Sequence, residues 1–106
     1  MNDPPDLPTR YKLRLFISGS TTRSTRAIEN MRRICEENIA DRYDLEIVDV
    51  YEHPEATQEL QVVATPTLIK LLPEPLRRII GDLSNKERVL AGLNIVPIVD
   101  RRRGNS

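Results

Sequence analysis

The chain of 106 residues contains no tryptophan, one cysteine and one histidine, and its only aromatic residues are three tyrosines and one phenylalanine. A lone Cys35 cannot form an internal disulfide, and with His53 it supplies too few ligands for a cysteine-based zinc site. Basic and acidic residues balance at 16 each, so the chain lacks the excess positive charge typical of nucleic-acid binding. We therefore expect no disulfide scaffold, no bound metal or cofactor, and no nucleic-acid partner.

Long apolar runs are also missing from the sequence. A membrane-spanning helix needs roughly 18 or more apolar residues, whereas the stretch around Leu68–Leu72 is interrupted by Lys70. The N-terminus carries Asp3 and Asp6 where a signal peptide has basic residues, and no apolar segment follows them. We expect a cytoplasmic protein without a membrane span.

Proline and charge mark the two ends of the chain. Three of the eight prolines fall in the first ten residues, and the polar stretch 100–106 carries three consecutive arginines. We expect a flexible lead-in over residues 1–10, a single domain over 11–99 and a basic tail over 100–106. Residues 1–69 hold 8 basic and 12 acidic side chains, and residues 70–106 hold 8 basic and 4 acidic. Regions of opposite charge favour association with a second copy or with a partner.

The first half has clear periodicity. Apolar residues alternate with charged ones over residues 11–18, which predicts a half-buried strand. The polar run 18–24 offers hydroxyl caps, and apolar residues at helical spacing through Ile39 predict a helix of about four turns. A second strand is expected over 44–50, completing a βαβ unit, and a short helix is expected from Pro54 to about Gln61.

The second half is ambiguous. Residues 65–72 and 76–81 suit two strands joined by a proline-rich turn, yet Leu76, Ile79 and Ile80 fit a helical turn equally well. Ser84 and Glu87 have the spacing of a capping box, which predicts a helix beginning near Ser84. Residues 93–99 are apolar, but Pro97 excludes a central strand there. Local preference does not select one structure.

The predicted element order resembles the thioredoxin-like fold, which raises a redox hypothesis. Such an enzyme needs a thiol where the first strand meets its helix, and this chain has Ser18-Gly19-Ser20-Thr21 there. Cys35 lies on the apolar face of the helix, where it reads as a small buried hydrophobe. We interpret His53 as a solvated loop residue, because no second ligand or nucleophile is spaced to join it.

Other polar groups are weak candidates for a site. Gly19 weakly suggests phosphate binding, but the glycine pattern of a phosphate loop is missing. Four carboxylates, at Asp41, Asp44, Asp49 and Glu52, are typical of a solvated surface. The basic pairs and runs at residues 77–78 and 101–103 could touch phosphate or an acidic protein face, although no aromatic residue interleaves with them.

Several segments together resemble the KaiB family of small circadian-clock proteins, which partner the KaiC ATPase. The segments that carry the resemblance cover the body of the chain from about Tyr11 to Ile95: Tyr11-Lys12-Leu13-Arg14-Leu15, Ser24-Thr25-Arg26-Ala27, Ile47-Val48-Asp49-Val50, Ala64-Thr65-Pro66-Thr67-Leu68 and Arg77-Arg78-Ile79-Ile80-Gly81-Asp82-Leu83-Ser84. The two most specific strings are Ala64-Thr65-Pro66-Thr67-Leu68 and Arg77-Arg78-Ile79-Ile80-Gly81-Asp82-Leu83-Ser84, in that order and spacing.

The resemblance implies a non-enzymatic regulator with two folds. One is a resting form that assembles as a dimer or tetramer, and the other is a rare thioredoxin-like monomer that binds the KaiC ring. The C-terminal half is the part that refolds in this family. A divergent or non-cyanobacterial member is indicated, acting in circadian or hourglass-type timing or in a stress response.

The resemblance also implies roles for individual residues. Arg26 and Lys70 match partner-contact positions, and Glu46 and Gln61 stand at partner-binding positions where clock members usually have Lys. Glu46 lies on the edge that resembles the site for KaiA, the third clock protein, so binding of KaiA is doubtful. Gly92, with its neighbours Ala91 and Asn94, is assigned to the fold switch, and replacing this glycine is expected to favour the switched form. The alternatives are a redox protein and an adaptor for a KaiC-linked histidine kinase.

Overall fold

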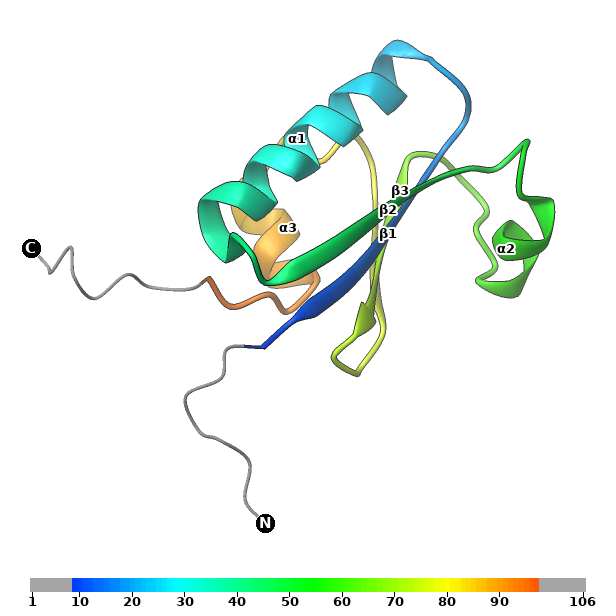
Figure 1. Cartoon of the computed structure of the whole chain (residues 1–106). Helices are drawn as coiled ribbons and strands as arrows, with labels where there is room; N and C mark the ends of the chain where they lie inside the picture. Colours follow the sequence, from blue (N-terminus) through cyan, green and yellow to red (C-terminus); the bar gives the residue numbers. More distant parts are fainter. Residues whose placement is uncertain (1–8, 98–106) are drawn as a thin grey trace, which may run out of the picture.

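The computed structural model describes residues 9–97 and consists of seven elements. They are β1 (Tyr11–Ile17), α1 (Thr22–Ile39), β2 (Tyr43–Asp49), α2 (Pro54–Glu59), β3 (Thr67–Leu72), β4 (Arg77–Ile80) and α3 (Lys86–Gly92). The strands form one sheet in the order β2-β1-β3-β4 (Figure 1). β1 pairs in parallel with β2 and antiparallel with β3, and β3 pairs antiparallel with β4. The predicted α/β class is confirmed.

The hydrophobic periodicity of the sequence explains why the βαβ unit forms. Parallel strands need a crossover connection, and α1 supplies it. Thr21 caps α1 by accepting a hydrogen bond from the backbone N–H of Ser24. The apolar stripe of the helix, which includes Ala27, Met31 and Ile34, is buried. Burying a side chain of this size contributes about 1.5–3 kcal/mol, so the stripe holds α1 on the sheet.

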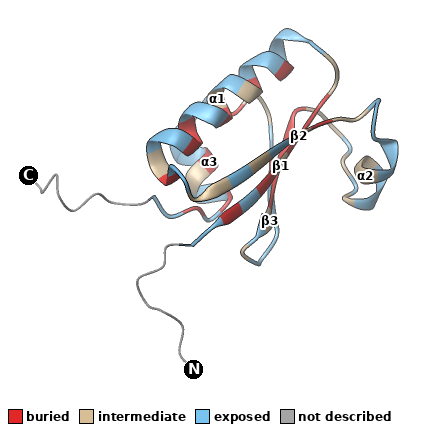
Figure 2. Ribbon diagram, viewed as in Figure 1, coloured by how far each residue is buried: buried red, intermediate tan, exposed pale blue. Residues whose placement is uncertain are grey.

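The core has two parts, one on each face of the sheet. α1 and α3 cover one face, where alternate residues of β1 such as Leu13 and Leu15 are buried (Figure 2). The opposite face contributes a smaller cluster of Phe16, Val48 and Ile69. Helix α2 lies at one end of the sheet, away from α1 and α3 (Figure 1). Successive residues of one strand therefore face opposite sides of the sheet and contact different parts of the core.

The ambiguous second half forms two strands rather than a helical turn. β4 pairs with β3 in the register Thr67 to Ile80 and Lys70 to Arg77. Ile79 is buried, whereas Leu76 precedes the strand and is exposed. Burial of Ile79 against the core selects the strand over the helical alternative, because local preference alone left both open.

Two predicted helix ends shift in the structure. α3 begins at Lys86 and is capped by Asn85, whose side chain accepts from the N–H of Arg88, so the predicted Ser84 cap is wrong. Asparagine caps as well as serine does, and the N–H of Ser84 already donates to the carboxylate of Asp82. α2 ends at Glu59, and Gln61 adopts a left-handed backbone with φ of 55°.

The predicted boundaries at both ends are only partly within the described residues. Most of the lead-in, residues 1–8, lies outside them, as do residues 98 and 99 and the whole tail 100–106. Arg10, which the sequence placed with the lead-in, is held against β2 by hydrogen bonds. Across residues 9–97, no helix combines the length and apolar character that a membrane crossing requires.

Candidate partner-binding surface

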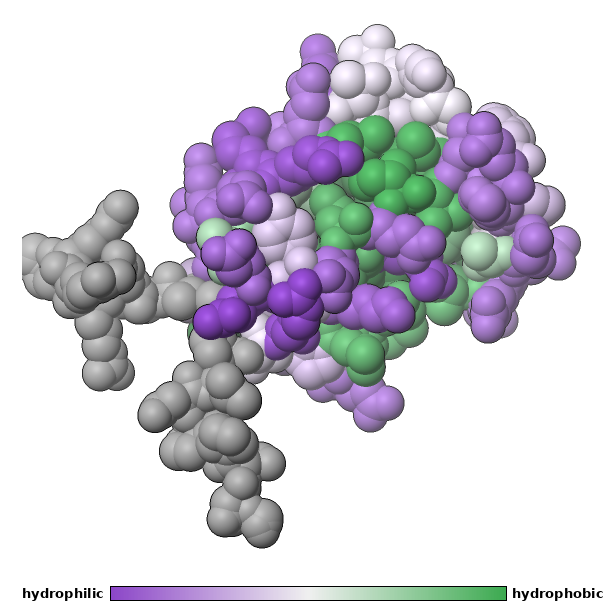
Figure 3. Space-filling view, in the orientation of Figure 1, coloured by the Kyte–Doolittle hydropathy of each residue, from purple (hydrophilic) through white to green (hydrophobic). Residues whose placement is uncertain are grey.

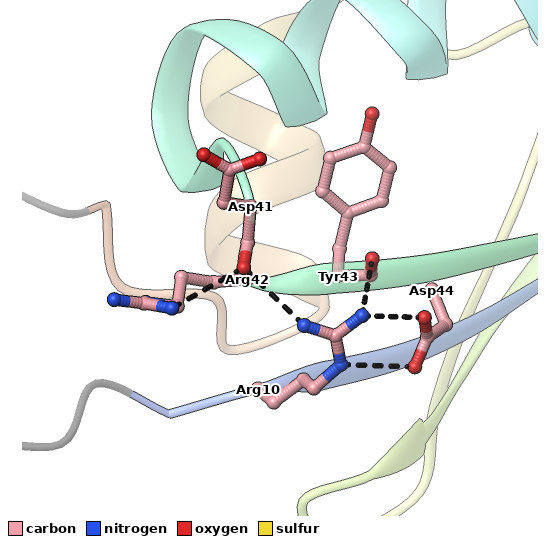
Figure 4. A network of polar contacts seen from close by, with 5 residues as sticks. All are labelled: Arg10, Asp41, Arg42, Tyr43 and Asp44. Atoms are coloured by element: carbon pink, nitrogen blue, oxygen red, sulfur yellow. Dashed lines mark hydrogen bonds and ion pairs between the residues drawn. The ribbon is translucent and has the colours of Figure 1, made fainter.

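Arg10 joins the starts of β1 and β2 through a network of polar contacts (Figure 4). Its guanidinium donates to both carboxylate oxygens of Asp44, at 2.6 and 3.0 Å, and to the carbonyls of Asp41 and Tyr43. The hydrogen bond from Arg10 lowers the pKa of Asp44. Asp44 therefore clamps two strands together rather than serving as a free acidic group.

A second contact at this end of the sheet involves Tyr43, the first residue of β2. Its hydroxyl donates to Glu36 of α1 at 2.5 Å, and this bond, with desolvation, raises the pKa of Tyr43 to about 12. The phenol is therefore protonated at neutral pH, and it connects β2 to α1 from the side opposite to Asp44.

Arg26 lies on the exposed side of α1. Its neighbours Ser24 and Ala27 are buried, so the helical period directs position 26 away from the sheet. Among the described residues, Arg26 takes part in neither of the two ion pairs, which are Arg10 with Asp44 and Arg14 with Glu46. A free guanidinium on a rigid helix is well suited to contact a carboxylate of a partner.

Glu46 lies on β2, an edge strand of the sheet. It faces Arg14 in the β1–β2 register, and the Arg14 Nε donates to Glu46 Oε1 at 2.9 Å. The pair is partly exposed, with 59% of the Glu46 side chain accessible. The arginine neutralises the acidic charge that the sequence places on this edge, although the Glu46 carboxylate remains reachable from outside.

Gln61 follows α2 and is exposed. Its left-handed backbone turns the chain, and its carbonyl accepts a hydrogen bond from Arg78 Nη1 of β4 at 3.3 Å. Arg78 is one of the two arginines that the sequence suggested for phosphate or acidic partners. In this structure it ties the end of α2 to the far edge of the sheet.

Lys70 departs from the sequence expectation. Its side chain is buried, with 1% exposed, and its ammonium donates to the carbonyls of Pro73 and Pro75 in the β3–β4 turn. Desolvation and the nearby charge of Arg77 lower the pKa of Lys70. A cation held in this way closes the turn and offers no surface to a partner, so the expected contact role does not hold in this conformation.

The four predicted contact residues do not form one patch. Glu46 lies on the face of the sheet that carries α2, because it alternates with Leu45 and Ile47, which pack on the α1 side. Gln61 follows α2, and Arg26 lies on α1, across the sheet from both. A partner that touched all of them would have to contact both faces of the sheet.

The β2 edge has an apolar character that the sequence analysis did not single out. Figure 3 shows a hydrophobic area in the middle of the visible face, bordered by hydrophilic side chains. Leu45, Ile47 and Val50 on and after β2 are only half-buried. Within the described chain, β2 pairs with β1 alone, so its outer backbone groups are free to pair with another strand. The alternation of apolar residues along β2 was the signal available in the sequence. It predicts a strand, but it does not reveal which edge of the sheet stays open.

Two strongly exposed apolar residues lie near α2. Tyr51 is 79% and Val63 is 88% exposed. Val63 also lines a cavity of about 190 Å³ together with Ser18, Thr57 and Thr65. The hydroxyls of Ser18 and Thr65 are hydrogen-bonded to each other at this position. The run Val62-Val63-Ala64 between two turns was the sequence signal for this feature.

The residues assigned to the fold switch gather at the end of α3. Asn94 has a left-handed backbone with φ of 59°, and its N–H donates to the carbonyl of Ala91. The N–H of Ile95 reaches the carbonyl of Leu90 at 2.8 Å. These two bonds form a Schellman motif, which ends a helix and favours glycine or asparagine at the left-handed position. Gly92 precedes it, and a Cβ there would approach Ile79 Cδ1 at 2.6 Å.

The remaining chemical candidates are placed as follows. Cys35 is fully buried, and desolvation raises the pKa of its thiol to about 12, so it holds little thiolate at neutral pH. His53 is exposed at the start of α2. Asp49 accepts a hydrogen bond from the N–H of Tyr51 in a local turn. Within residues 9–97, no three histidine, cysteine or acidic side chains are grouped to hold a metal ion.

A family model described as KaiB domain matches residues 14–95. The chain belongs to the KaiB family. A relative from Synechocystis sp. named circadian clock protein KaiB3 is 56% identical over 88 residues, which cover 83% of this chain and 86% of the relative. The circadian clock oscillator protein KaiB of Microcystis aeruginosa is 43% identical over 95 residues, covering 90% and 91% of the two chains. These names describe clock proteins of the KaiB family rather than enzymes.

Solved structures show the fold of this KaiB-family chain. The N-terminal domain of Synechococcus elongatus SasA matches with a TM-score of 0.63 and 20% identity, over 89% of this chain and 86% of that domain. Mitochondrial thioredoxin 3 of Saccharomyces cerevisiae matches with a TM-score of 0.65 and 18% identity, over 81% and 78%. The predicted thioredoxin-like fold is therefore confirmed.

Proposed function

We propose that this KaiB-family protein acts without chemistry of its own, by binding a KaiC-type ATPase and modulating its phosphorylation and ATPase cycle in circadian, hourglass-type or stress-related regulation. The observation that carries the proposal is the KaiB-domain match over residues 14–95. The thioredoxin-like conformation agrees with it, because the family resemblance assigns KaiC binding to that form. The burial of Cys35 argues against the competing redox function.

Arg26 is our candidate for the charged contact with the ATPase. It is exposed on α1, and it is free of the two ion pairs found among residues 9–97. Lys70 is not a candidate in this conformation, since its ammonium is bound by two carbonyls of its own turn. A carboxylate on the ATPase would gain a bidentate partner at Arg26 without first breaking an internal bond.

The test is size-exclusion chromatography with light scattering, alone and after hours with the organism's KaiC and nucleotide. We expect co-elution with KaiC, weakened about tenfold or more by Arg26→Glu, because reversed charge at a contact costs several kcal/mol. Arg32→Glu is the matched control, as Arg32 is also exposed on α1. Failure of the unaltered protein to bind any KaiC would refute the function, and equal weakening by both variants would refute the role of Arg26.

We further propose that KaiA binds weakly or not at all. The β2 edge carries the Arg14–Glu46 pair, with an acidic group outermost, at the position where clock members usually have Lys. Adding KaiA to the KaiC complex should leave its mass unchanged, and Glu46→Lys should favour a larger complex. A KaiC-linked histidine kinase stays a predicted partner, which a pull-down with that kinase would test.

The resting form is proposed to be a dimer or tetramer with a second packing of the C-terminal half. Two residues support this proposal, because Leu83 and Asn94 both adopt left-handed backbones in this half, at φ of 64° and 59°. Such a conformation costs a leucine about 1–2 kcal/mol, and an asparagine less, which narrows the free-energy gap to another packing. Light scattering of the protein alone distinguishes this assembly from a stable monomer.

A further inference from the structure

A cavity of about 320 Å³ lies between the first turn of α1 and the loop that joins β4 to α3. Arg23 of α1 and Arg88 and Val89 of α3 line it, together with the last two residues of β4 and the loop residues 81–85. This volume is at the lower end of the range for pockets that bind small molecules. None of the residues assigned to KaiC binding lines it, so the site is separate from the proposed function.

Neither arginine of this cavity is used by the fold. The ion pairs within residues 9–97 are Arg10 with Asp44 and Arg14 with Glu46. The side-chain hydrogen bonds of that part of the chain engage neither the Arg23 nor the Arg88 guanidinium, although the backbone N–H of Arg88 donates to Asn85. Both side chains are exposed. Ten guanidinium N–H donors, five on each arginine, are therefore available at one small cavity.

The acidic and capping side chains that line the cavity already form hydrogen bonds with nearby backbone groups. Asp82 Oδ1 accepts from the N–H of Ser84 at 3.1 Å, and the Asp82 carbonyl accepts from the Asn30 side chain at 2.9 Å. The Asn85 side chain caps α3. Asp82 thus reduces the net charge of the cavity from two positive charges to one without pairing with either arginine. The ligand would be held by side chains and not by the start of the short helix.

We propose that this cavity binds a phosphate group, either as inorganic phosphate or on a small phosphate monoester. Guanidinium groups match phosphate oxygens with pairs of parallel hydrogen bonds, and a tetrahedral phosphate offers separate oxygens to two arginines on different walls. A carboxylate has only two oxygens in one plane and satisfies one such fork. The hydroxyl of Ser84, an exposed residue of the lining, adds a donor.

Occupation of the cavity has a consequence for conformation. Arg23 belongs to the N-terminal half, whereas Arg88 belongs to α3 in the C-terminal half. A phosphate bridging them binds only when α3 and the β4–α3 loop are packed as in this structure. By mass action, it stabilises this packing against unfolding or any other arrangement of the C-terminal half.

The test is an NMR titration of the full chain with inorganic phosphate and with AMP, at constant ionic strength. We expect saturable shifts of the Gly81 and Ser84 amides, and dissociation constants raised about fivefold or more by Arg23→Gln and by Arg88→Gln. Arg32→Gln is the control, because it removes the same charge from α1 nine residues later, on the opposite side of the helix. Unshifted amides of β1 will show that each variant remains folded.

The two ligands distinguish the source of the phosphate. Equal affinity for both indicates that the phosphate group alone is bound, and tighter binding of AMP indicates a monoester. The absence of saturable shifts for either ligand, or equal weakening by Arg32→Gln, would overturn the proposal. KaiC binding tests the proposed function independently, so failure of one leaves the other standing.

Discussion

The two halves of this molecule are built from similar elements but are held together differently. β1, α1 and β2 form a parallel unit whose seven-residue strands pair along their full length, and both ion pairs of the described chain join β1 or the residue before it to β2. β3, β4 and α3 contain a four-residue edge strand and a seven-residue helix. Left-handed backbones occur at Leu83 and Asn94 in this half and at Asp41 in the N-terminal half, so they do not separate the two.

This difference assigns stability and adaptability to separate parts of the chain. α1 buries six residues against the sheet, whereas within α3 only Val89 is buried, with Leu93 following at its end. Short elements that bury little apolar surface, such as β4 and α3, open at lower free energy than the core. We expect the C-terminal half to open while the N-terminal half stays folded, which is also what a change of packing would require.

The largest expected effect on stability comes from truncating one buried leucine side chain in each half. Leu13 in β1 and Leu93 after α3 are both fully buried. Leu13→Ala should lower the free energy of global unfolding by about 2–5 kcal/mol, because it leaves a cavity in the cooperative core. Leu93→Ala should mainly promote opening of the C-terminal half and move the global urea midpoint less. Equal losses in urea denaturation would show that the halves are one cooperative unit.

The N-terminal half is also the half that the sequence predicted well. The alternation in Tyr11–Ile17 and the apolar stripe of α1 follow directly from which side chains are buried. The choice between strand and helix at Leu76–Ile80 could not be made locally, because it depends on Ile79 packing against residues far away in the chain. The Asn85 cap was missed because Ser84 and Asn85 are both good caps, and the sequence does not state at which of them the loop enters the helix; in the structure the Asn85 side chain accepts from the N–H of Arg88.

The sequence predicted which residues belong to the candidate site, but not how these residues are arranged in space. Arg26 is exposed, as a partner contact requires, whereas the burial of Lys70 depends on how the Pro73–Pro75 turn folds back over it. No pattern in the sequence predicts this geometry. The Arg23–Arg88 cavity was likewise beyond local reasoning, since its two arginines are 65 positions apart and meet only through the fold.

A second prediction concerns the contact between Gly92 and Ile79. Gly92→Ala gains about 1 kcal/mol of helix propensity, but its Cβ would lie 2.6 Å from Ile79 Cδ1, and such overpacking costs about 1–3 kcal/mol. We expect Gly92→Ala to destabilise this conformation in the unaltered protein. In an Ile79→Val background, which lacks that Cδ1 atom but keeps a methyl group near the Cγ1 position at 3.2 Å, the same change should be less destabilising.

A double-mutant cycle of these changes, measured by urea denaturation, should give a coupling of about 1 kcal/mol. The same effect of Gly92→Ala in both backgrounds would contradict the contact. The cycle also tests the prediction that replacing Gly92 favours the switched, thioredoxin-like form. A clash between the added Cβ and Ile79 of β4 opposes that outcome unless the Ile79 side chain moves aside.

A third and smaller effect is expected at Asn94, which ends α3 with a left-handed backbone. Asn94→Gly should preserve or raise stability, whereas Asn94→Ala should cost about 1 kcal/mol, because alanine lacks the short polar side chain whose local hydrogen bonding makes this conformation accessible to asparagine. Thermal denaturation of the two variants provides the comparison. A more stable alanine variant would show that Asn94 is not left-handed in solution.

The smallest effect concerns the Arg10–Asp44 clamp in the N-terminal half. Arg10 lowers the pKa of Asp44 in the folded protein, so the clamp stabilises the fold above the ordinary aspartate pKa of about 3.9 and loses this contribution as pH falls through the lowered value. The difference in melting temperature between the unaltered protein and Arg10→Gln should be small, because both side chains are exposed. It should shrink as the pH falls below the ordinary aspartate pKa, and a difference that grows in acid would contradict the clamp.

The most direct test of separate stability in the two halves is native-state hydrogen exchange at increasing denaturant. The amide of Leu15 in β1, which pairs with Ile47 of β2, reports on the N-terminal half, and those of Val89 and Leu93, bonded within α3, report on the other. We predict that the α3 amides exchange through an opening at least about 1 kcal/mol below global unfolding, while Leu15 exchanges only with global unfolding. Identical opening free energies and denaturant dependence for all three amides would contradict this division.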